Sequence, residues 1–289
     1  MSDLSESEIS AESLRPDGLV EATLNYIAES SEKPVIYTYK PPPGTPRATG
    51  TTETKPVVIR NARLQSDLSL DTKGFQLVRQ STAVRDFYDR AEVQKVYYPE
   101  VEILLKQTTG AEKVAIFDHQ VRNIQLSQQG EKDAREYVWA VHNDYTATSG
   151  PRRVREHLSP AEAEQRIRHR FAEINVWRPI RGPIESSPLA VCDASSIAAE
   201  DFVPSDLVYP DKIGETYRFK HNPNHRWFYF PQMERNEAIL LKCYDSKEDG
   251  RARFTAHTAF EDPTSAPGAA ARESVEVRAL LFWPEQDRN

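Results

Sequence analysis

The chain has 289 residues and a mass of 32.9 kDa, which allows one large domain or two ordinary ones. Lysine and arginine number 37 against 44 aspartates and glutamates, so the net charge of −7 disfavours general nucleic-acid binding through phosphates. No apolar run approaches the roughly 18 residues that cross a bilayer, and the start is acidic and polar, so we expect a cytoplasmic protein without membrane contact. Two cysteines are too few for a disulfide framework or a thiolate zinc site, so any metal must be held by histidines and carboxylates.

The N-terminal third begins with a polar segment and continues with alternating helix and loop signals. Residues 1–15 are rich in serine and glutamate and lack periodicity, which predicts a disordered tail. Apolar residues at helical spacing over 17–30 and again over 81–107 predict helices. Prolines and glycines over 41–56 indicate a loop. Farther along, 159–174 is predicted to be helical, with a serine cap, a proline in the first turn and a capping-box glutamate.

Strand-like runs of β-branched and aromatic residues occur throughout and are most frequent in the C-terminal half. The predicted strands are 56–64, 74–80, 112–122, 174–180, 225–230, 237–245, 251–260 and 274–283. Because the C-terminal half is mostly β with proline-rich turns, we predict a mainly β fold with flanking helices (α+β), as a barrel or sandwich. We place a single domain over residues 16–289, with an N-terminal α/β extension.

The segment 136–150 contains the residues best suited to chemistry. His142 and Asp144 lie two apart in a strand-like run, so both side chains point to the same face. An imidazole and a carboxylate without a thiolate suit a first-row metal, and a distant second histidine would complete the facial triad of non-haem Fe(II) oxygenases. Alone, the pair is a weak signal, because polar residues at strand ends commonly form turns.

The C-terminal region strengthens the signal from this pair. His257 lies in another strand-like run, and Arg272, Ser274 and Arg278 follow at even spacing, which puts these three on one strand face. Arginine grips a carboxylate through two charge-assisted hydrogen bonds, and its burial in a barrel is costly unless an anion meets it. This order of residues therefore suits a metal and a dicarboxylic co-substrate bound side by side.

At these residues the sequence resembles the Fe(II)/2-oxoglutarate dioxygenases, whose fold is a double-stranded β-helix or jelly roll. A narrower resemblance, over about residues 55–284, is to the family of the cephamycin methoxylation protein, which includes fungal hydroxylases, desaturases and an endoperoxide-forming oxygenase of meroterpenoid biosynthesis. The matching blocks are HNDYTATSGPRRVREHL, NVWRPIRGPIESSPLAVCDASS, HRWFYFPQMERNEAILLKCYDS, FTAHTAFEDP and ARESVEVRALLF. The resemblance implies a jelly-roll core over about 110–284 and a dioxygenase that oxidises a small-molecule secondary metabolite with O2 while 2-oxoglutarate becomes succinate.

The resemblance also implies roles for individual residues. The implied Fe(II) ligands are His142, Asp144 and His257. The implied 2-oxoglutarate residues are Arg272, Ser274 and, in an assisting role, Arg278. His225 is a rival third ligand, but we prefer His257 because an apolar strand precedes it and the arginine strand follows it. We expect Tyr145, His225 and Trp227 to line the substrate pocket.

Other functions remain open at this point. A metal-dependent oxygenase without a keto acid would keep the barrel and the iron. A β-rich binding module or partner subunit would use neither. A nucleic-acid demethylase is suggested only by RESVEVR, which looks like the two-arginine strand of the DNA-alkylation repair dioxygenases, and the acidic net charge argues against it. We expect a small-molecule substrate and O2 as partners, without nucleic acid or membrane, and leave a homodimer open.

Overall fold

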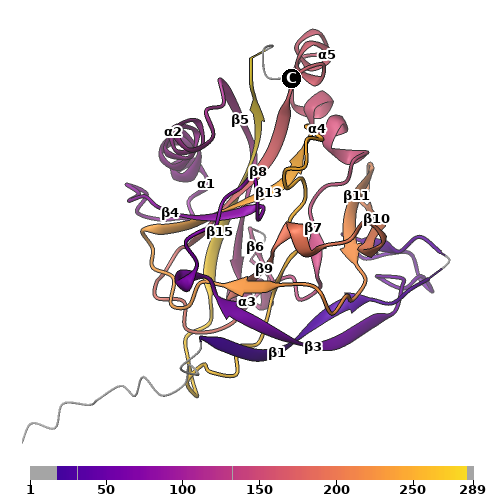
Figure 1. Ribbon diagram of the computed structural model, residues 1–289, viewed down its shortest axis with the longest axis vertical. Helices are drawn as coiled ribbons and strands as arrows, with labels where there is room; N and C mark the ends of the chain where they lie inside the picture. The colour runs from indigo at the N-terminus through magenta and orange to yellow at the C-terminus, as the bar shows by residue number, and fades with distance from the viewer. Residues whose placement is uncertain (1–17, 31, 132, 285–289) are drawn as a thin grey trace, which may run out of the picture.

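The computed structural model describes residues 18–30, 32–131 and 133–284, and the predicted tail over 1–15 lies outside this part of the chain (Figure 1). Within the described residues, the strands form a nine-stranded and a six-stranded sheet. Apolar side chains of the two sheets, including Phe75, Ile239, Val191 and Phe228, pack together between them. The prediction of a mainly β fold with flanking helices is confirmed.

The six-stranded sheet carries a helical layer on its outer face. Its strands in spatial order are β4 (Phe75–Arg79), β13 (Glu237–Asp245), β8 (Phe171–Pro179), β15 (Glu273–Phe282), β5 (Lys113–Asn123) and β6 (Ala134–Arg135). The helical layer is α1 (Arg90–Glu92), a π-helical segment (Val93–Tyr97) and α2 (Tyr98–Thr109). Val101 and Leu105 of α2 pack against Val176 and Val277 of the sheet. Because side chains alternate along a strand, the neighbouring residues of β8 and β15 face the interior.

The nine-stranded sheet is built from shorter strands. In spatial order these are β1 (Leu19–Ile27), β3 (Thr52–Asn61), β12 (Trp227–Tyr229), β9 (Leu189–Cys192), β14 (His257–Ala259), β7 (His142–Asn143), β11 (Ile213–Phe219), β10 (Phe202–Val208) and β2 (Val35–Tyr37). From β5 to β15 the chain passes repeatedly between the sheets, so that β13-β8-β15-β5 faces β12-β9-β14-β7. Two facing sets of four strands with this alternation are the arrangement of a jelly roll. Strands β1 and β3 lie side by side and extend the second set (Figure 1).

Residues 17–30 were predicted to be helical, and the structure corrects this. They contain β1, which pairs with β3 along its whole length, from Leu19 opposite Arg60 to Ile27 opposite Thr52. Val20, Leu24 and Tyr26 are buried at even positions, so a period of two also fits the apolar residues. The pairing with β3 satisfies the backbone and decides between the two periods.

Two other predicted helices are present but shorter. The helix predicted over 81–107 begins only at Arg90, because the Asp89 side chain caps it by accepting from the Ala91 and Glu92 amides. The helix predicted over 159–174 is α5 (Pro160–Ile167), after which β8 begins. Ser159 occupies the cap position without a side-chain hydrogen bond, so no capping box forms.

The remaining helical elements are short. They are α3 (Ile124–Gln128), α4 (Ser149–His157) and the 3-10 turns Ala62–Leu64, Ala194–Ser196 and Ala199–Asp201. The predicted strands over 225–230 and 251–260 shrink to β12 and β14, of three residues each. Among the helices described, none is long and apolar enough to cross a membrane.

Candidate active site

Two neighbouring strands and the bend after one of them bring together the three predicted metal ligands. His142 on β7 lies opposite His257 on β14, and their ring centroids are 4.4 Å apart. Asp144 follows β7 directly, with Oδ1 3.6 Å from Nε2 of His142. One ligand atom from each of the three residues lies within 4.8 Å of the others. The arrangement could hold one metal ion between two imidazoles and a carboxylate.

The surroundings set the protonation state that metal binding requires. Nδ1 of His142 donates to the Ala140 carbonyl at 2.8 Å, and Nδ1 of His257 donates to the Thr255 carbonyl at 3.0 Å. Since a carbonyl only accepts, Nδ1 carries a hydrogen in each ring, so in the neutral form the lone pair available to a metal is on Nε2. Burial and the neighbouring His257 ring lower the pKa of His142 to about 3, so it is neutral at pH 7.

The carboxyl group of Asp144 is held in its ionised form. Burial alone would raise its pKa, but Arg278 and the two imidazoles outweigh this and lower the pKa below its usual range. Arg278 is the first of these favourable neighbours, with Nε 3.3 Å from Oδ2 of Asp144. The cluster therefore offers two imidazole nitrogens and one anionic carboxylate oxygen.

Arg272 and Ser274 lie beside this cluster with unused hydrogen-bonding capacity. Arg272 directly precedes β15, donates from Nη1 to the Ser187 carbonyl at 2.6 Å and stacks 4.2 Å from the Tyr137 ring centroid. Its Nε and the Oγ of Ser274 are buried and have no hydrogen-bond partner among the described residues. Burial lowers the pKa of Arg272 to about 9, as expected for a cation that lacks a close anion.

Arg278 has a different environment from Arg272. Its guanidinium pairs with three carboxylates: Asp144, Asp118 at 3.3 Å and Glu276 at 3.0 Å. The positive charge of Arg278 is therefore compensated, and its guanidinium directly contacts Asp144, a predicted metal ligand. The structure places this predicted assisting residue next to Asp144, the predicted iron ligand.

His225 and Trp227 do not join this cluster and do not line the cavity beside it. Nε2 of His225 lies 3.0 Å from Asp201, and Nε1 of Trp227 donates to the Tyr26 hydroxyl at 2.7 Å. Trp227 packs in the apolar cluster on the outer face of the nine-stranded sheet, whereas the adjacent Phe228 faces the interior. Side-chain alternation along β12 separates the two faces. The same placement removes His225 as a rival metal ligand.

Tyr145 lies on the interior side, next to Asp144 in the chain. Its ring belongs to the apolar cluster between the sheets, and the Arg153 guanidinium lies 5.9 Å from its centroid. Burial raises the pKa of its hydroxyl well above the usual value. Its role in the substrate pocket stays a prediction.

Several residues at the site were not identified from the sequence. The cavity beside the cluster is lined by both histidines together with Arg122, Trp177, Arg272 and Glu276. Glu276 had a usable signal, because it shares the even spacing of β15 with Ser274 and Arg278. Arg122 had none, because only the pairing of β5 with β15 brings it opposite Ser274.

Glu173 is a buried acid near the cluster whose titration should be measurable. It is fully buried on β8, and neither carboxylate oxygen has a partner in the part of the chain described. Burial raises its pKa well above the usual value. Because the folded pKa exceeds the unfolded one, its contribution to stability is complete below the unfolded pKa, near 4.5, and is lost as the pH rises toward the folded pKa.

Glu173→Gln should therefore flatten the dependence of stability on pH. Above the unfolded pKa, the free energy of unfolding of the unmodified protein should fall relative to the variant by at most about 1.4 kcal/mol per pH unit. Urea unfolding of both metal-free proteins at a series of pH values measures this difference. Parallel curves would show that Glu173 does not titrate abnormally.

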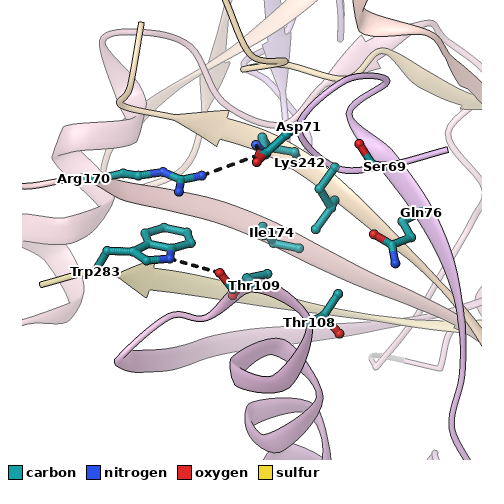
Figure 2. A pocket seen from close by; sticks show the side chains of 10 residues that line it. Ser69, Asp71, Gln76, Thr108, Thr109, Arg170, Ile174, Lys242 and Trp283 are labelled. Atoms are coloured by element: carbon teal, nitrogen blue, oxygen red, sulfur yellow. Dashed lines mark hydrogen bonds and ion pairs between the residues drawn. The ribbon is translucent and has the colours of Figure 1, made fainter. Parts of the chain in front are cut away.

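A second pocket lies on the outer face of the six-stranded sheet, and its charges are already paired (Figure 2). Lys242 forms ion pairs with Asp71 and, at 3.0 Å, with Asp245. Arg170 pairs with Asp245 at 2.8 Å and stacks 3.9 Å from the Trp283 ring centroid. This network ties β8 and β13 to the loop before β4, and we interpret it as structural.

Comparisons with known proteins agree with this geometry. A family model described as "Oxidoreductase/YMDC permease-like domain" matches residues 24–282. The hydroxylase/desaturase efuI of Hormonema carpetanum is 35% identical, over 93% of this chain and 97% of that protein. The Fe(II)/2-oxoglutarate-dependent dioxygenase nvfI of Aspergillus novofumigatus is 30% identical, over 87% and 92%.

A solved structure shows the same fold. The iron and alpha-ketoglutarate-dependent endoperoxidase NvfI superposes with a TM-score of 0.84 at 26% sequence identity, covering 93% of this chain and 99% of that chain. This likeness confirms the predicted jelly roll. The chain therefore belongs to the oxidoreductase family of these Fe(II)/2-oxoglutarate-dependent dioxygenases.

Proposed function

We propose that this protein oxidises a small-molecule secondary metabolite with Fe(II), 2-oxoglutarate and O2, by hydroxylation, desaturation or endoperoxide formation. The observation that carries the proposal is the cluster of His142, Asp144 and His257 beside the unpartnered donors of Arg272 and Ser274. The names of the relatives, hydroxylase/desaturase and Fe(II)/2-oxoglutarate-dependent dioxygenase, support it.

The residues present fit both groups. Two imidazole nitrogens and one carboxylate oxygen are the donor set of non-haem Fe(II) oxygenases, and they leave open coordination positions. An anion next to Arg272 would satisfy its buried Nε and the Oγ of Ser274, which find no partner within the described ranges. The far carboxylate of 2-oxoglutarate is such an anion.

The charges around the cluster support joint binding of the two groups. The three cations are Arg122, Arg272 and Arg278, and the three anions are Asp118, Asp144 and Glu276. These formal charges sum to zero. A divalent cation together with a dianion keeps the sum at zero, whereas either alone would leave an uncompensated charge in a low-dielectric interior.

Each residue has a defined task in the reaction. His142, His257 and Asp144 bind and orient the metal, and Arg272 with Ser274 orients the keto acid by its far carboxylate. Trp177 forms part of the cavity wall. The chemistry supplied by the bound iron and keto acid is O2 activation coupled to decarboxylation of 2-oxoglutarate to succinate.

Anaerobic addition of Fe(II) and then 2-oxoglutarate to the purified protein tests this function. We expect the visible charge-transfer band of a chelated keto acid, which His257→Ala abolishes and His225→Ala preserves, because His225 is paired with Asp201 on the other face. Circular dichroism of both variants checks their folding. A missing band in the unmodified protein, or its loss in folded His225→Ala, would contradict the proposal.

The other partner predictions come from the sequence alone. The acidic net charge of −7 supports a protein that acts without nucleic acid. The absence of a membrane partner, the cytoplasmic location and a homodimer also stay predictions. Analytical ultracentrifugation of the purified protein would test the last of these.

A further inference from the structure

The two carboxylate oxygens of Asp144 have different surroundings. Oδ1 faces the cluster, 3.6 Å from Nε2 of His142. Oδ2 accepts a hydrogen bond from Nδ2 of Asn175 at 2.8 Å, and Nε of Arg278 lies 3.3 Å from the same oxygen. One oxygen is thus turned toward the position of the metal, and the other is held from behind.

Asn175 is well placed to hold this carboxylate. It is fully buried on β8, with β13 on one side and β15 on the other, and it lies opposite Arg278 in the β8–β15 pairing. Asp144, by contrast, lies in a bend just after the two-residue strand β7. A residue in the middle of a sheet therefore fixes a side chain from a less regular segment.

The orientation of the Asn175 amide follows from charge. An ionised carboxylate only accepts hydrogen bonds, so the NH2 group of the amide must face Oδ2 of Asp144. The amide oxygen then has no hydrogen-bond partner among the residues that the structure describes, although it is buried. An unmet acceptor costs free energy, which indicates that the contact with Asp144 determines the identity of this residue.

We propose that Asn175 is a positioning residue for the metal centre: it retains Oδ2 of Asp144, so that the carboxylate offers Oδ1 alone to the metal. Two imidazoles and one carboxylate oxygen leave three of six octahedral positions free, enough for a chelating keto acid and O2. A carboxylate free to bind through both oxygens would occupy one of these positions. The inference rests on the proposed function for the identity of the metal.

The other two predicted ligands, His142 and His257, are held by main-chain carbonyl groups, and a side-chain substitution does not remove a main-chain carbonyl. The Ala140 and Thr255 carbonyls accept from the two histidines. Asn175 is thus an outer partner whose removal isolates the effect on one ligand. Loss of such a partner typically weakens metal binding by about 10- to 100-fold.

Titration with Co(II) tests the role of Asn175 without any turnover. We expect Asn175→Leu, which keeps the bulk and removes the donor, to weaken Co(II) binding by about 10- to 100-fold. Its Co(II) ligand-field spectrum should also change, because Oδ2 of Asp144 loses its hydrogen bond, is held by Arg278 alone and can turn toward the metal. Glu173→Gln is the matched control, because Glu173 lies on the same strand face and makes no hydrogen bond to Asp144, and it should bind Co(II) as the unmodified protein does.

Circular dichroism shows whether each Asn175 variant is folded, and only a folded variant is interpreted. If Asn175→Leu does not fold, Asn175→Ala removes the same donor with a smaller side chain and is measured in the same way. Equal affinity and an unchanged spectrum in a folded Asn175 variant would overturn the positioning role and leave the metal site standing. Failure of the unmodified protein to bind Co(II) would instead overturn the proposed function.

Discussion

Replacement of His142 or Asp144 by alanine is expected to abolish iron-dependent formation of succinate while the fold remains intact. Each change removes one of the three atoms that converge within 4.8 Å. Loss of a direct ligand should exceed the roughly 100-fold effect of losing an outer partner. The strand β7 pairs with β11 and β14 through its main chain, so the pairing should survive either side-chain change.

Iron stoichiometry after anaerobic loading and succinate yield under air measure this effect. His119→Ala is the matched control, because His119 is a buried histidine away from the cluster whose Nδ1 is hydrogen-bonded to the Tyr98 hydroxyl, 2.8 Å away. The control should retain iron and turnover. Full activity in folded His142→Ala or Asp144→Ala would refute the assignment of the ligands.

The residues of the candidate metal site could be predicted because their spacing in the sequence is a local signal. His142 and Asp144 are two residues apart, and the even spacing of Arg272, Ser274 and Arg278 follows from strand alternation. Which arginine has an unmet charge could not be predicted, since Asp118 meets Arg278 only after β5 and β15 pair.

The wrong predictions also arise because strand pairing between distant segments is not visible in the sequence. Val20, Leu24 and Ile27 fit a helical period, and Val20, Leu24 and Tyr26 fit a strand, so only the pairing of β1 with β3 decides. On β12, alternation correctly separates two faces but does not say which one is interior.

Asn175 illustrates which residues of the site cannot be predicted from the sequence. It lies 31 residues from Asp144, and its neighbours in the chain suggest only a buried strand. Two features of the fold bring Asn175 to the cluster: the register of β8 with β15, and the bend after β7. Neither is encoded in a short pattern, so a residue that holds a ligand from behind is hard to identify from one sequence.

The two arginines of the C-terminal strand region should have separable roles. Arg272→Ala should weaken 2-oxoglutarate binding by about 30- to 4000-fold, since removal of one partner of a buried charge pair costs about 2–5 kcal/mol. It should leave metal affinity nearly unchanged, because its guanidinium contacts Ser187 and Tyr137 and has an unpartnered Nε within the described residues.

Arg278→Ala should instead weaken metal binding, because it removes one of the two groups that hold Oδ2 of Asp144 in place. Titration of each folded variant with Co(II), followed by 2-oxoglutarate at saturating Co(II), separates the two affinities. If Arg278→Ala weakened only 2-oxoglutarate binding and Arg272→Ala weakened only metal binding, the two assignments would be reversed. The expected pattern follows from charge balance: the arginine whose charge is unmet in the protein is the one that a dicarboxylate completes.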